Sequence, residues 1–104
     1  MPDGSSQDYT IDRIIHEPAR LLITAYLYVV ESADYVFLMQ NTGLTWGNLS
    51  SHLSKLEDAG YVEITKEFVQ KKPHTMVQLT ETGREAFDSY RRQMKSLFED
   101  LPEA

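Results

Sequence analysis

The chain contains no cysteine, which excludes a disulfide framework, a thiolate zinc site and a cysteine nucleophile. It also has no apolar run near the ~18–20 residues that a membrane-spanning helix needs. The first residues lack the basic start and apolar middle of a secretion signal, and we expect residues 1–10 to form a flexible tail. Together these absences favour a cytoplasmic protein without a membrane partner.

The chain has no excess of basic residues either, because its 10 lysines and arginines face 16 aspartates and glutamates, for a formal net charge of -6. Taken alone, this charge argues against a polyanion as partner. From Leu44 to Thr80, however, the bases and the acids balance, and Val69 to Thr80 holds two lysines and no acid. The acidic excess therefore lies elsewhere, which limits where a polyanion could bind.

Motifs of catalysis and metal binding are missing as well. The chain has no glycine-rich phosphate loop, no nucleophile elbow and no HExxH sequence. Its histidines, His16, His52 and His74, fall on different predicted elements without a neighbouring cysteine or paired carboxylates. We therefore expect no enzyme activity, no cofactor and no metal site.

The first half of the chain carries helical patterns. Pro18 suits the first turn of a helix, where a missing N–H costs little. Asp34 is a plausible N-cap for a short helix from Tyr35 to Gln40 or Asn41, which Gly43 would end in a left-handed conformation. The apolar positions expected along the first of these helices are Leu21, Leu22, Ala25, Tyr26, Val29 and Val30.

A third helix has two sides of different character. Thr45 can cap it, it runs to about Ala59, and Gly60 ends it. Leucines at i, i+4 and i+7 form one apolar stripe, which predicts a buried side. The other side is small and polar, and it carries little charge. The leucines of the apolar stripe are Leu49, Leu53 and Leu56. The polar side of the helix includes Gly47, Ser50, Ser51, Ser54 and Asp58.

After Gly60 the period of the pattern changes to two, which predicts a β-hairpin with a basic tip and a turn at Pro73. Thr80 can then cap a long last helix. The fold class is therefore mainly α with a small β-hairpin, in a single domain from residue 11 to 104. It comprises a helix-turn-helix at about 34–59, a wing at about 61–80 and a C-terminal helix at about 81–101.

At this point the sequence resembles a known family. The stretch "GNLSSHLSKLEDAGYV", then "K-x-F" and "KP-x-T" in the hairpin, then "LTETGR", is similar to the winged-helix DNA-binding domains of small prokaryotic, especially archaeal, transcriptional regulators related to the MarR and ArsR groups. The resemblance covers about residues 15–97. It implies a dimeric repressor or activator that binds double-stranded DNA, with the third helix in the major groove and the wing on the backbone or in the minor groove.

The same resemblance implies a set of DNA-binding residues. On the third helix these are Thr45, Trp46, Gly47, Asn48, Ser50, Ser51, Ser54 and Lys55, and at the wing tip Lys71, Lys72, His74 and Thr75. The residue types suit the task, because Asn can pair with adenine and lysines neutralise phosphates. For Trp46 a packed, partly buried ring is the favoured alternative, and for His52 a structural hydrogen bond.

The apolar pattern of the last helix predicts a homodimer. Its apolar positions alternate three and four apart, and this seam is larger than so small a domain can easily cover. Packing onto the first helix of the same chain is the alternative. The seam consists of Phe87, Tyr90, Met94, Leu97 and Leu101. A cleft at such an interface could also hold a small-molecule effector, which the sequence does not identify.

Two questions stay open at this stage. Phe37 and Met39 could widen the core, or they could form an apolar patch for a second subunit or a ligand. The alternative function is a winged-helix protein–protein interaction module that does not bind DNA, which the acidic total and this apolar pair would suit.

Overall fold

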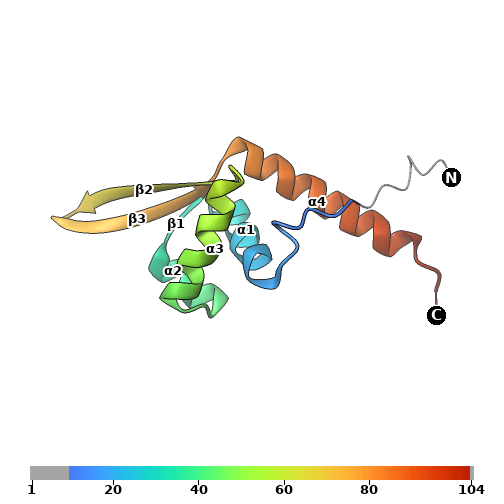
Figure 1. Cartoon of the computed structure of the whole chain (residues 1–104), viewed down its shortest axis with the longest axis horizontal. Coiled ribbons are helices and arrows are strands. Elements are labelled where there is room, and N and C mark those ends of the chain that lie inside the picture. Colours follow the sequence, from blue (N-terminus) through green and yellow to red (C-terminus); the bar gives the residue numbers. More distant parts are fainter. Residues whose placement is uncertain (1–9, 104) are drawn as a thin grey trace.

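The computed structural model describes residues 10–103, and the expected tail falls outside them except for Thr10. The elements follow in the order α1 (Pro18–Val30), β1 (Ser32–Asp34), α2 (Tyr35–Thr42), α3 (Trp46–Asp58), β2 (Val62–Val69), β3 (Lys72–Leu79) and α4 (Glu81–Asp100). In Figure 1 the first three helices form a body from which the β2–β3 hairpin projects at one end and α4 at the other. This is a winged-helix fold with a long C-terminal helix, as the sequence predicts.

The predicted helix ends are confirmed by their hydrogen bonds. The carboxylate of Asp34 accepts a hydrogen bond from the backbone N–H of Phe37, and the hydroxyl of Thr45 accepts one from the backbone N–H of Asn48. The hydroxyl of Thr80 caps α4 in the same way. Gly43 adopts the left-handed conformation, with φ 76°, that closes α2 and allows the tight turn into α3.

The sheet has a third strand that the sequence does not reveal. β1 pairs with β3, so the strand order is β1-β3-β2 and both ladders are antiparallel. The turn of the wing also differs from the prediction. It is formed by Gln70 and Lys71, which have φ of 53° and 66°, whereas Pro73 lies within β3 opposite Phe68.

The main core lies between the three helices of the body and the base of the sheet. Its fully buried side chains come from every element except α4. Phe37 and Met39 are half-buried and pack against this core, and the Phe37 ring meets Tyr26 edge-on at 6.2 Å. In this chain both residues widen the core, which is the first of the two alternatives. The buried members are Ile23, Leu27, Ala33, Leu38, Leu49, Leu53, Leu56, Val62, Val77 and Leu79.

The buried stripe of α1 is not the predicted one. Ile23 and Leu27 face the core, whereas Leu22, Val29 and Val30 are exposed. Two polar side chains share the buried stripe, Arg20 and Thr24. The apolar residues of this helix occupy almost its whole circumference, so spacing alone does not identify the side that packs.

A second cluster joins α4 to the body. Phe87 and Tyr90 are each 6% exposed and pack against Ile15, which lies in the turn before α1. His16 forms a 2.7 Å hydrogen bond with the Tyr90 hydroxyl. The first two positions of the predicted dimer seam are therefore covered by their own chain. Of the remaining positions, Met94 and Leu97 are half-buried and Leu101 is 54% exposed.

The corner where α3, the wing and α4 meet is closely packed around Tyr61. Its backbone N–H donates a hydrogen bond to the carbonyl of Leu56 at 2.9 Å, and its own carbonyl accepts one from the N–H of Thr80 at 3.0 Å. Its hydroxyl donates to the Asp12 carboxylate at 2.6 Å. Burial, together with this hydrogen bond, raises the pKa of Tyr61 to about 12, so the phenol stays protonated. The corner fixes the start of the wing relative to the end of α3.

A prediction follows from the glycine at this corner. A Cβ added at Gly83 would collide with the carbonyl group of Tyr61, whereas a Cβ at Gly47 of α3 meets nothing within 4 Å. We expect Gly83→Ala to lower the free energy of unfolding by about 1–3 kcal/mol. The matched change Gly47→Ala should raise it by up to about 1 kcal/mol, because alanine loses less backbone entropy in a helix. Urea unfolding of both variants measures the contrast, and equal effects would contradict this packing.

Candidate nucleic-acid interface

The two sides of α3 are separated as the sequence predicts. Leu49, Leu53 and Leu56 are fully buried. The residues of the predicted contact surface lie on the other side, and all of them are exposed except Ser50, which is half-buried. The exposed members are Thr45, Trp46, Gly47, Asn48, Ser51, Ser54 and Lys55. Because the leucines hold one side of the helix in the core, the small polar side is available to a large partner.

Trp46 stands at the first position of α3 and remains 58% exposed. Its ring packs on that of Tyr35, with the centroids 4.5 Å apart and the planes tilted by 44°. The favoured alternative of a packed Trp46 is therefore correct for one side of the ring, but most of the ring faces outward. Tyr35, which sequence reasoning did not select, positions it.

A notch of about 200 Å³ separates the start of α3 from the wing. Trp46 and Tyr35 line it on one side, and Pro73, His74 and Thr75 of β3 line it on the other. His74 and Thr75 are half-buried, so they belong to this notch rather than to the wing tip. The exposed tip carries Lys71 in the turn and Lys72 beside it. The structure thus brings the start of α3 and the inner part of the predicted wing surface together.

The sides of the wing differ in charge. Alternate residues of a strand point to opposite faces, and Val62 and Ile64 pack on the core, so Lys66 and Phe68 share the face of β2 that looks toward the body. Glu63 and Glu67 lie on the opposite face. Sequence reasoning assigned no role to Lys66 or Phe68, although the "K-x-F" spacing places both on one face of a strand.

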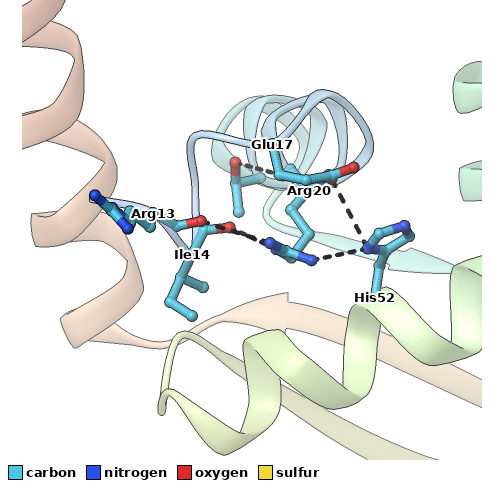
Figure 2. Close-up of polar contacts among 6 residues, drawn as sticks. Arg13, Ile14, Glu17, Arg20 and His52 are labelled. Atoms are coloured by element: carbon cyan, nitrogen blue, oxygen red, sulfur yellow. Dashed lines mark hydrogen bonds and ion pairs between the residues drawn. The ribbon is translucent and has the colours of Figure 1, made fainter. Parts of the chain in front are cut away.

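His52 has the structural role that the sequence favours. Figure 2 shows it at the flank of α3, where its Nδ1 lies 3.0 Å from Arg20 Nη1 and 3.8 Å from Glu17 Oε1. The guanidinium of Arg20 is buried and donates from Nε to the carbonyl of Ile14 at 2.6 Å. Since the guanidinium can only donate, Nδ1 of His52 accepts its hydrogen bond. This contact ties α3 to α1.

The three histidines lie apart from one another. The ring of His16 contacts Tyr90 and that of His52 contacts Arg20. The third histidine, His74, lines the notch. Within residues 10–103, the His, Asp and Glu side chains do not gather in any group of three that could hold a metal ion. Over the same residues, no helix combines the length and the apolar character needed to cross a membrane.

Comparison with known proteins identifies the family and the fold. A family model described as a winged helix DNA-binding domain matches residues 19–98. An uncharacterized protein of Methanocaldococcus jannaschii is 37% identical over 78 residues, which are 75% of this chain and 85% of that protein.

Solved structures agree with this match. A transcriptional regulator homologue of Pyrococcus horikoshii superposes with a TM-score of 0.82 and 28% identity, over 92% of this chain and 97% of that one. A MarR-family regulator of Silicibacter pomeroyi has the same fold, with a TM-score of 0.64 and 20% identity, over 86% of this chain and 62% of that one.

Proposed function

The chain belongs to the winged-helix DNA-binding domain family, a family of regulators and not of enzymes, and we propose that it binds duplex DNA as a homodimeric transcriptional regulator. In this proposal residues 11–104 act as one domain. The small polar side of α3 enters the major groove, and the wing contacts the backbone or the minor groove. The observation that carries the proposal is the exposed polar side of α3, backed by fully buried leucines and flanked by a wing with lysines at its tip.

The chemistry of this surface fits DNA. Small side chains at the front of α3 allow close approach to base edges, and Asn48 offers an amide that matches adenine. The amides at the N-terminus of α3 and the lysines of the wing suit phosphates. The balance of charge from Leu44 to Thr80 removes the objection that the net charge of -6 raises. Since this surface carries few cations, we expect modest affinity that falls as salt rises, with a slope set by those few phosphate contacts.

Two surfaces support the homodimer. The last turns of α4 project beyond the body in Figure 1 and expose Phe98 (66%) and Leu101 (54%). Leu22 and Val29 of α1 are exposed by 43% and 76%. Burying such side chains against a second copy is favourable by ~25 cal/mol for each Å² of apolar area. A dimer would also present two DNA-binding surfaces, so that two half-sites add to a weak single contact.

The hollow between α1 and α4 is where a small effector would act in this proposal. It has a volume of about 530 Å³ and combines apolar walls with three cationic side chains. This size and lining suit a small ligand that has an apolar body and an anionic group. The cations are Arg91, Arg92 and Lys95, and the apolar walls come from Leu21, Phe87, Tyr90 and Met94.

A first prediction concerns phosphate contacts. The double change Lys71→Glu and Lys72→Glu should weaken binding to all duplexes by about tenfold or more. Each phosphate contact that is lost also loses the counterion release that favours binding. Fluorescence anisotropy at low and high salt measures the affinity and its salt dependence. The control Arg13→Glu changes the net charge by half as much and lies outside α3 and the wing. A loss half as large in the control would show that only total charge matters.

A second prediction concerns sequence reading. Asn48→Ala should change which duplexes are bound, with a loss of about 1–3 kcal/mol in discrimination at one position, because a bidentate contact to adenine is removed. Selection of bound duplexes from a random pool compares the two proteins. The lysine variant should keep the wild-type preference. If Asn48→Ala selects the same sequences as wild type, α3 does not read bases through this residue.

A third prediction concerns the dimer. Wild type should sediment at about twice the chain mass of 12.0 kDa. Leu97→Glu should shift the protein toward the monomer, because it places a charge in the apolar seam. Ser96→Glu introduces the same charge at the neighbouring exposed position, which points away from the seam, and should leave the dimer intact. Analytical ultracentrifugation distinguishes them, and a monomeric wild type would overturn the dimer.

A further inference from the structure

The wing tip carries an aromatic side chain that stays exposed among residues 10–103. Phe68 is 75% exposed, although it lies in a strand whose earlier residues Val62 and Ile64 pack on the core. Its partner across the hairpin is Pro73, so the apolar surface continues across both strands. Keeping a Phe ring in water forfeits about 1.5–3 kcal/mol relative to burial, so a partner that covered this position would be stabilised by it.

The register determines the direction in which this apolar pair points. Phe68 shares its face of β2 with Ile64 and Lys66, and Pro73 shares its face of β3 with Thr75. Pro73 and Thr75 line the notch together with Trp46 of α3. The Phe68–Pro73 pair therefore lies on the side of the wing that continues the exposed side of α3. Figure 1 shows the β2–β3 hairpin projecting from the body.

The charges around the pair select the kind of partner. Lys66 lies on the same face, two residues before Phe68, and Lys71 follows in the turn, whereas Lys72 pairs with Val69 on the other face. The acids of the wing, Glu63 and Glu67, point to the other face. A purely apolar protein surface would have to desolvate these lysines, which is costly. A polyanion with an apolar interior matches both features, because base stacks lie between rows of phosphates.

The tip is also narrow. Gln70 and Lys71 form a two-residue turn with positive φ at both positions, so the hairpin ends within two residues of Phe68. Such a tip presents a single ring rather than a broad surface. Proteins that bind the minor groove often insert Phe, Leu or Pro between base pairs and kink the duplex by about 20–90°.

We propose that Phe68, supported by Pro73, is an apolar wedge that enters the minor groove and kinks the bound DNA, while Lys66 and Lys71 hold the flanking phosphates. This inference rests on the proposed function, because it requires a duplex on the wing. The kink favours flexible pyrimidine–purine steps under the wing, since these steps unstack most readily. Part of the sequence preference then comes from DNA deformability at positions that α3 does not touch.

The test measures the bend directly. The probe is a set of duplexes of about 30 base pairs, recovered by wild type from a random pool and labelled at both ends for energy transfer. Wild type, Phe68→Ala, Phe68→Leu and Val69→Ala are compared at saturation. Val69 is the matched control, because it is a neighbouring apolar residue at the tip, is 46% exposed and points to the other face.

We expect wild type, Phe68→Leu and Val69→Ala to bend the duplex, and Phe68→Ala to bind it with most of the bend lost. The affinity of Phe68→Ala should fall only about tenfold or less, because the unstacking cost disappears together with the ring contact. Thermal unfolding should not distinguish the variants, since Phe68 is exposed.

The outcomes separate the inference from the proposed function. If wild type binds no duplex, the proposed function itself fails. If wild type binds without bending DNA, or if Phe68→Ala bends it as wild type does, the wedge is wrong and DNA binding stands. If Phe68→Ala instead dissociates the protein into monomers in sedimentation, Phe68 contacts a second subunit and the wedge is also wrong.

Discussion

The arrangement depends on one constraint, the complete burial of the leucine stripe of α3. Leu49, Leu53 and Leu56 lose all contact with solvent against α1 and the sheet. Once these three side chains are fixed, the rotation of α3 about its axis is fixed, and Asn48, Ser51 and Lys55 must face outward. The contact of His52 with Arg20 secures the flank of the same helix. The polar surface is therefore a consequence of the core that lies beneath it.

The separation of charge between elements and strand faces explains how an acidic chain can offer a surface that suits the proposed DNA partner. Charge is sorted by strand face and by element, so that Lys66 points toward the side of α3 and Glu63 and Glu67 point away from it. The corner at Tyr61 and Gly83 fixes the angle at which the wing leaves the body. Position, rather than net charge, decides whether phosphates can approach.

Much of this fold can be predicted from local sequence signals. Asp34, Thr45, Thr80 and Gly43 act through groups a few residues away, so the helix limits were predictable. Features that depend on distant partners were not. β1 is three residues long and exists only because β3 lies beside it. The buried guanidinium of Arg20 is satisfied by the carbonyl of Ile14 and by His52, which no spacing rule reveals. The outward Phe68 became visible only from the strand register.

Mapping the amide resonances of the protein during titration with duplex DNA tests the proposed surface most directly. At 12.0 kDa per chain the spectrum is accessible. Shifts should concentrate in residues 45–55 and 66–75 and include the Trp46 indole, whereas the exposed acidic face of the wing at Glu63 should change little. Shifts confined to α4, or their absence when duplex is in excess at low salt, would contradict the claim that α3 and the wing form the DNA-binding surface.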